Sequence, residues 1–192
     1  MENDIRDTHD SLRGRLLVAM PSLVDPNFSH TVIYICEHSS EGAMGLVVNR
    51  PLELPLSRVF AQMDLPCPEE LSQKLLLLGG PVDQQRGFIL HGATEQQWQS
   101  SVSVTQQISL TTSMDIIEAL ASNQGPENSL MVLGYAGWGP GQLERELREN
   151  AWLITPTEPA FLFDIPYDER AAAAAAQLGV DLNLLSTHVG HA

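Results

Sequence analysis

The chain has 192 residues, of which 43% are hydrophobic, so it can bury a sizeable core and is not a wholly disordered protein. No run of about 18 apolar residues occurs, which excludes a membrane-spanning helix. Ten basic and 24 acidic residues give a net charge of −14, and Lys74 is the single lysine. Because this charge repels phosphate groups, direct binding to nucleic acid or to an anionic membrane is not expected.

The cysteines and the N-terminal segment indicate a cytoplasmic protein. Cys36 and Cys67 lack the dense, even spacing of a disulfide-stabilised secreted fold. The first residues are acidic, whereas a signal peptide begins with basic ones, and the apolar run that follows is short and ends at Pro21. We therefore expect a reducing compartment and no secretion signal.

Short apolar runs bounded by glycine, proline and polar residues predict most of the strands. The expected strands are, in chain order, 15–20, 30–38, 43–48, 75–78, 86–91, 102–110, 130–133, 152–154 and 161–163. The second of these is apolar on both faces, which is typical of a strand in the middle of a covered sheet.

Apolar residues at helical spacing predict four helices between these strands. They are 56–63, 112–122, 142–150 and 171–176. The second begins with a capping-box pattern, Thr112-x-x-Asp115, and the last is alanine-rich. Strands outnumber helices and hairpins mix with helical connections, so we expect an α+β fold. We expect residues 1–12 to be flexible and residues 13–192 to form one domain.

A glycine-rich segment, 134–144, follows a predicted buried strand and precedes a predicted helix. Such a segment can bring backbone N–H groups close to an anion. It lacks the Gly-Lys-Ser/Thr ending of a phosphate loop, and carboxylates occupy the first turns of the helix. Two interpretations stay open: a ligand-binding loop, or a tight turn that packs closely with Trp138 as a plug.

Cys36 and His38 stand two residues apart at the end of a predicted strand, where alternation would place them on one face. An adjacent imidazolium would lower the pKa of the thiol and make Cys36 a reactive thiol. The alternative is an ordinary buried cysteine, in which case Cys36 is more shielded than Cys67, which lies between two prolines.

Polar residues collect where several predicted strands end, and turns and caps ordinarily use the same residue types. His91 belongs to this group. A small-ligand site is expected where the 49–51 strand end, the 79–83 turn and the 134–142 segment converge, with Tyr135 as part of an apolar wall. The candidate ligand-binding residues are Asn49, Arg50, Gly79, Gly80, Asp83, Gly137 and Trp138. No catalytic residue, metal site or cofactor is predicted, and no Gly-x-Ser-x-Gly elbow occurs.

Taken together, the segments resemble the AlgH/YqgE family of bacterial proteins. The matching segments are 14–21 (GRLLVAMP), 25–28 (DPNF), 31–32 (TV), 36–38 (CEH), 45–51 (GLVVNRP), 79–82 (GGPV), 87–91 (GFILH), 134–138 (GYAGW) and 142–144 (QLE). The resemblance implies a cytosolic protein with a curved, barrel-like mixed sheet flanked by helices. It supplies no catalytic residues. The family's label of transcriptional regulator does not fit direct DNA contact by a chain of charge −14.

Two classes of function stay open. The first is a non-enzymatic binding or regulatory protein that acts through a protein or small-molecule partner, and we favour it. The second is an enzyme, small-molecule or thiol-dependent, whose pocket is built from the glycine-rich loops.

Overall fold

The computed structural model describes residues 11–186 and contains ten strands and seven α-helices in that range. The strands are β1 (Leu16–Ala19), β2 (Val32–Ser39), β3 (Gly42–Val47), β4 (Pro51–Pro55), β5 (Leu75–Leu78), β6 (Val82–Gly92), β7 (Ser101–Ser103), β8 (Ile108–Thr111), β9 (Ser129–Trp138) and β10 (Trp152–Thr155). The helices are α1 (Leu56–Gln62), α2 (Glu69–Ser72), α3 (Met114–Ala121), α4 (Gln142–Arg148), α5 (Pro159–Asp164), α6 (Arg170–Ala176) and α7 (Leu182–Ser186). A 3₁₀ turn, Tyr167–Glu169, precedes α6.

All ten strands belong to one curved sheet, whose main path is β10-β1-β2-β3-β9-β6-β8-β7. β5 pairs with β4 and runs parallel to β9, whereas the other pairs are antiparallel, so the sheet is mixed. The long strand β9 contacts β3, β5 and β6 and so joins the two halves of the sheet. Register shifts in β2 and β6 locally bend the strands, which lets the sheet curl.

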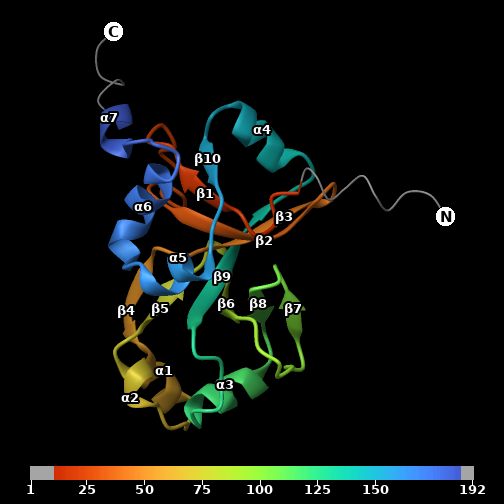
Figure 1. Cartoon of the computed structure of the whole chain (residues 1–192), viewed down its shortest axis with the longest axis vertical. Coiled ribbons are helices and arrows are strands. Elements are labelled where there is room, and N and C mark those ends of the chain that lie inside the picture. Colours follow the sequence, from red (N-terminus) through yellow and green to blue (C-terminus); the bar gives the residue numbers. More distant parts are fainter. Residues whose placement is uncertain (1–10, 187–192) are drawn as a thin grey trace, which may run out of the picture.

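The curl separates the hydrophobic side chains into a central core and two outer cores. Alternation along β1 shows the separation, because Val18 packs in the central core and Leu17 packs in an outer one. α5 and α6 close the central core, α4 covers one outer core, and α1 and α3 cover the other (Figure 1). The α+β class and the curved mixed sheet expected from the sequence are confirmed.

Three predicted elements differ from the structure. Residues 161–163 lie in α5, a helix that Pro159 opens at its first turn, instead of in a strand. The predicted strand 102–110 is a hairpin of β7 and β8, because a turn stabilised by the Thr105 hydroxyl interrupts it. The predicted glycine-rich loop at 134–141 is largely the end of β9, which continues to Trp138.

The structure does not describe residues 1–10 of the N-terminal segment that we expected to be flexible. Among the helices of the described range, none is both long enough and apolar enough to cross a membrane.

Candidate functional site

Three of the segments expected to form a ligand site meet through their backbones. The Val47 N–H donates to the Gly79 carbonyl at 2.8 Å, and the Leu78 N–H donates to the Arg50 carbonyl at 2.9 Å. On the other side, the Gly79 N–H donates to the Leu133 carbonyl at 2.7 Å. The end of β3, the end of β5 and the middle of β9 therefore lie side by side.

We call this meeting point of β3, β5 and β9 the crossing. Its glycines are needed for close packing. Gly80 has φ +155°, and a Cβ there would lie 2.1 Å from the Tyr135 carbonyl carbon. A Cβ on Gly79 would lie 2.4 Å from the Gly134 carbonyl oxygen. The space that a ligand would need beside these two glycines is occupied by the backbone of β9. This favours the close-packing interpretation of Gly79 and Gly80.

Asn49 and Arg50 hold the loop that precedes β2. The Asn49 side chain accepts a hydrogen bond from the Val32 N–H at 2.8 Å and donates to the His30 carbonyl at 2.9 Å. The Arg50 guanidinium donates to the carbonyls of Pro26, Asn27 and Ser29 at 2.7–3.0 Å. Partial burial lowers the pKa of Arg50, and Asp25 partly offsets that shift. These contacts are structural, and a role of either residue in ligand binding stays a prediction.

The remaining predicted residues lie apart from the crossing. Asp83 is exposed, with φ +44°, where β6 shifts its register against β9. Gly137 pairs with Met44 and Trp138 pairs with Ala43, at the end of β3 that is far from Asn49 and Arg50. Of the 134–142 segment, the structure brings Gly134, Tyr135 and the backbone nitrogen of Ala136 to the crossing.

Trp138 has its own role on the outer face of the sheet. It is buried, and it stacks on Phe28 with a ring-centroid distance of 6.4 Å. The indole N–H groups of Trp138 and Trp152 both donate to one carboxylate oxygen of Glu146, each at 2.9 Å. The two tryptophans therefore fix α4 on the sheet, in agreement with the interpretation of Trp138 as a plug.

A β-bulge separates Cys36 from His38. The register shifts between Ile35 and Glu37, so the two side chains do not share a face as simple alternation predicted. Cys36 is 1% exposed in the central core, where burial, with a contribution from Glu37, raises the pKa of its thiol. This environment is the opposite of what a reactive thiol requires.

The His38 side chain instead links the N-terminal segment to α4. Its Nδ1 accepts a hydrogen bond from the Leu12 N–H at 2.9 Å, which leaves the proton on Nε2. Nε2 donates to a carboxylate oxygen of Glu144 at 2.6 Å, and this hydrogen bond lowers the pKa of Glu144. Both ring nitrogens of His38 therefore have partners other than Cys36.

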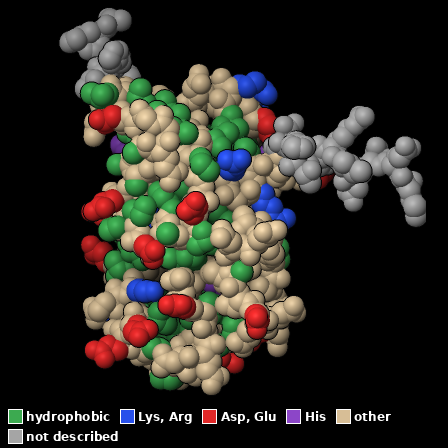
Figure 2. All heavy atoms as spheres, in the orientation of Figure 1, with side chains coloured by type: hydrophobic (Ala, Val, Ile, Leu, Met, Phe, Trp, Pro, Cys, Tyr) green, Lys and Arg blue, Asp and Glu red, His purple; other side chains and the backbone are tan. Residues whose placement is uncertain are grey.

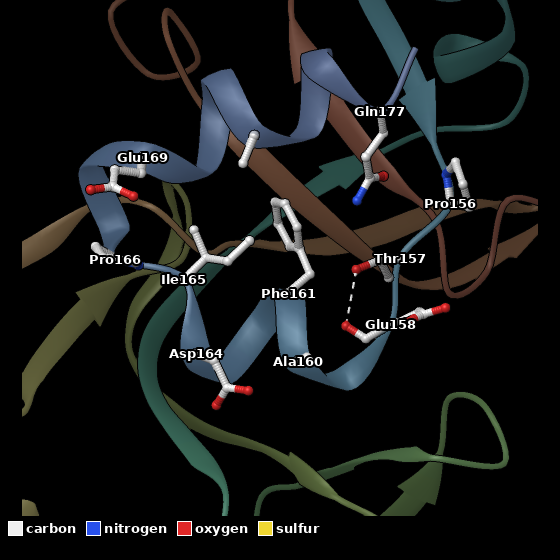
Figure 3. Close-up of a pocket in the computed structure, with 11 residues that line it drawn as sticks. Pro156, Thr157, Glu158, Ala160, Phe161, Asp164, Ile165, Pro166, Glu169 and Gln177 are labelled. Carbon is white, nitrogen blue, oxygen red and sulfur yellow. Dashed lines mark hydrogen bonds between the residues drawn. The ribbon is translucent and has the colours of Figure 1, made fainter. Parts of the chain in front are cut away.

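The sequence did not point to the pocket between α5 and α6, which has a volume of about 670 Å³. Phe161 from α5 and Ile165, which directly follows α5, point toward α6 and form its apolar floor, with Glu169 at one end and Glu158 at the other (Figure 3). The sequence pattern predicted a strand at 161–163, so it placed Phe161 in a strand and not in the helix α5. The signal that could have found it is Pro159, because proline is common at the first turn of a helix.

The buried side chain of Arg170 connects the two helices that form this pocket. It is 1% exposed, and its guanidinium donates to the carbonyls of Leu162 and Ile165, at 2.6 and 3.0 Å, and to the carbonyl of Val48. Burial lowers the pKa of Arg170 to about 10, partly offset by Tyr167, so the side chain keeps its charge at neutral pH. It thereby ties α5 and α6 to the end of β3.

The pocket carries acidic and apolar groups together. Glu158, Asp164 and Glu169 are exposed lining residues, and within residues 11–186 none of them forms an ion pair with Lys, Arg or His. Figure 2 shows green hydrophobic side chains with red acidic ones around them where Figure 1 places α5 and α6. In the described part of the chain, no cluster of three His, Cys, Asp or Glu side chains is placed to hold a metal ion.

Comparison with protein families identifies a model described as AlgH-like, which matches residues 16–183. The chain belongs to the AlgH-like family. A UPF0301 protein of Stutzerimonas stutzeri is 51% identical over 183 residues, which cover 94% of this chain and 96% of that one. A UPF0301 protein of Nitrosococcus oceani is 48% identical over 181 residues, with coverage of 94% and 96%.

Two solved structures share the fold. The solution structure of the AlgH protein from Pseudomonas aeruginosa superposes with a TM-score of 0.77 at 46% identity and covers 100% of both chains. The crystal structure of protein DIP2367 from Corynebacterium diphtheriae has a TM-score of 0.72 at 20% identity and covers 97% of this chain and 94% of that one. At 20% identity, the second structure shows only that the two chains share a fold.

Proposed function

We propose that this AlgH-like chain is a cytoplasmic, non-enzymatic binding protein, and that the α5–α6 pocket takes a small organic cation with an apolar body. The observation that carries the proposal is the combination of an apolar floor, Phe161 and Ile165, with carboxylates that have no basic partner within residues 11–186. The pocket volume of about 670 Å³ lies in the range of sites for small ligands.

The charge distribution favours a cation over an anion or a neutral ligand. No Lys or Arg is among the residues that line the pocket in the described structure, and the whole chain carries a net charge of −14. An ammonium group would lie near Glu158 or Glu169 while its apolar part replaces water on the half-buried Ile165 and Ala173. Burial of the apolar part supplies affinity, and the carboxylates supply selectivity for charge.

The alternative, an enzyme with a pocket built from the glycine-rich loops, has less support. At the crossing, the glycines pack against backbone atoms, and the polar groups of Asn49 and Arg50 bind the neighbouring loop. The thiol of Cys36 is shielded. A binding function also agrees with α5 and α6 being held as one unit by Arg170, because a preformed pocket loses less entropy on binding.

The test is an NMR titration of the full chain with phenethylammonium, with the neutral phenethyl alcohol as the matched probe. We expect the ammonium compound to shift the amide signals of Phe161, Ile165 and Ala173 and to bind more tightly than the alcohol. Its affinity should fall as NaCl rises from about 50 to about 500 mM, because salt screens exposed charges.

Substitutions separate the effect of the pocket carboxylates on binding from the effect of the net charge of the whole protein. Glu158→Gln and Glu169→Gln should each weaken ammonium binding by about two- to fivefold, the usual size of an exposed charge contact. Asp168→Asn removes the same charge beside the pocket but not from its lining and should change the affinity less. Equal affinity for the alcohol, or shifts confined to another part of the molecule, would contradict the proposal.

A further inference from the structure

A cluster of hydroxyl groups lies on the sheet face opposite the central core, where β6, β7 and β8 are adjacent. Ser101 on β7 stands directly across from Thr111 on β8, and Ser109 stands across from both Ser103 and His91. Their neighbours on these strands alternate toward the central core, as Leu90 and Leu110 do. The strand pairing therefore collects Ser, Thr and His side chains at the edge of a face that is otherwise hydrophobic.

His91, Thr111 and Ser101 form a continuous hydrogen-bonded chain. The Nδ1 atom of His91 lies 2.8 Å from the Gly92 carbonyl, which can only accept, so Nδ1 carries a proton. Nε2 lies 2.8 Å from the Thr111 hydroxyl, which lies 2.9 Å from the Ser101 hydroxyl. The Thr111 hydroxyl has one proton, which it donates either to Ser101 or to Nε2 of His91. When a neutral imidazole accepts that proton at Nε2, Thr111 is free to accept a hydrogen bond from Ser101.

The hydrogen-bonded chain runs from a buried end at His91 to an exposed end at Ser101. His91 is 2% exposed and Thr111 is 0% exposed, whereas Ser101 is exposed. Burial lowers the pKa of His91, partly offset by the hydrogen bond to Gly92, so the imidazole is neutral at neutral pH and Nε2 presents its lone pair to Thr111. No charged side chain contributes to this shift.

Ser101 opens into a pocket of about 390 Å³. The part of its wall that the structure describes is made of hydroxyl, amide and imidazole groups with Ala93 and Trp98, and no Asp, Glu, Lys or Arg contributes to it. A neutral polar pocket of this size admits a small electrophile to the Ser101 hydroxyl. The site is distinct from the α5–α6 pocket and does not depend on its function.

We propose that Ser101 is a reactive hydroxyl that accepts an acyl group from an activated ester or thioester, with Thr111 and His91 as the proton relay. A bond forms between Ser101 Oγ and the acyl carbonyl carbon, and the bond from that carbon to the leaving oxygen or sulfur breaks. The Ser101 proton passes to Thr111 Oγ as the Thr111 proton passes to His91 Nε2. The leaving group departs as an anion and takes up the proton, which returns from His91 Nε2 through Thr111.

The experiment treats the full chain with p-nitrophenyl acetate and follows p-nitrophenolate release, with mass spectrometry of the digested product. We expect one acetyl group per chain, on the peptide that contains Ser101, and none in Ser101→Ala. Ser122→Ala is the matched control, because Ser122 is also an exposed serine but lies outside this pocket, and its hydroxyl donates to the Glu118 carbonyl at 3.0 Å. Its acetylation rate should be unchanged.

Thr111 tests the relay itself. Thr111→Val fills the same space without a hydroxyl and should slow acetylation at least about tenfold, whereas Thr111→Ser keeps the hydroxyl and should restore the rate. In the wild type the rate should rise with pH as His91 loses its proton, and in Thr111→Val this rise should disappear. Equal rates in Thr111→Val and wild type, or acetylation at another residue only, would overturn the proposal. Circular dichroism checks that each variant is folded.

Discussion

At the residue scale, the surroundings of a side chain decide its chemistry more than its neighbours in sequence do. Cys36 and His38 are two positions apart, yet a single extra residue in β2 sends the thiol into the central core and the imidazole toward α4. The thiol is then desolvated, and His38 is engaged at both nitrogens. The chemistry expected from their spacing therefore has no geometric basis.

This arrangement predicts that Cys67 reacts with N-ethylmaleimide well before Cys36. Burial raises the pKa of both thiols, but Cys36 is 1% exposed, while Cys67 is only partly buried in the segment before α2. Cys36 should react only when the fold opens locally, at least about tenfold more slowly. In a Cys67→Ser chain, labelling should wait for denaturant. Faster labelling of Cys36 than of Cys67 in the native protein would contradict this account.

At the element scale, the crossing of β3, β5 and β9 depends on glycine at particular places. Gly80 and Gly134 both have positive φ, and each approaches the backbone of the other's segment. Leu46 and Val47 of β3 and Leu76 and Leu77 of β5 are buried beside it, so these strands have little room to move aside. In the sequence, glycines at such positions suggested a ligand-binding loop. In the structure, they allow the strands to pack closely.

We expect Gly80→Ala to lower the free energy of unfolding by about 3–5 kcal/mol, because the new Cβ has a backbone clash and an unfavourable φ. Gly87→Ala is the matched control in the same strand region, since its nearest atom would be 3.9 Å away and φ is ordinary. It should change stability by less than about 1 kcal/mol. Denaturant unfolding of both variants makes the comparison, and a similar loss in both would be evidence against the crossing as the cause.

Apolar runs such as Leu75–Leu78 were sufficient to predict most strands, because a run buried on both faces is visible in one sequence. The helix at 159–164 was missed because its apolar residues are contiguous and short, so periodicity does not separate helix from strand. For the candidate sites, His91 was visible as a polar residue at a strand end. Its relay to Ser101 was not, since that contact depends on the register of three strands.

At the scale of the whole molecule, the charge of −14 limits the partners that the protein can meet directly. Arg50 and Arg170, two of its ten basic residues, donate to backbone carbonyls within the fold, so they contribute little to an outward-facing positive surface. Regulation of transcription by this chain would then proceed through another protein.

We expect no sequence-specific DNA binding by the isolated protein. Fluorescence anisotropy with labelled duplexes should show no saturable binding at low salt, because too few arginines are free to replace the counterions of several phosphates. A basic DNA-binding domain in the same buffer serves as the positive control. Tight binding to one duplex with a steep salt dependence would refute the expectation.

The pairing of β1 with β10 has a consequence for how the chain is made. Leu16 and Ala19 pair with Thr155 and Trp152, so the first strand of the described fold needs the last one. At about 5–20 residues per second, a ribosome takes roughly 7–26 s to synthesise the chain between them. During that interval one edge of β1, an apolar strand, has no partner and can associate with other nascent chains. A chain that ends before β10 would keep that edge open permanently, so premature termination should yield an aggregating product instead of a smaller folded one.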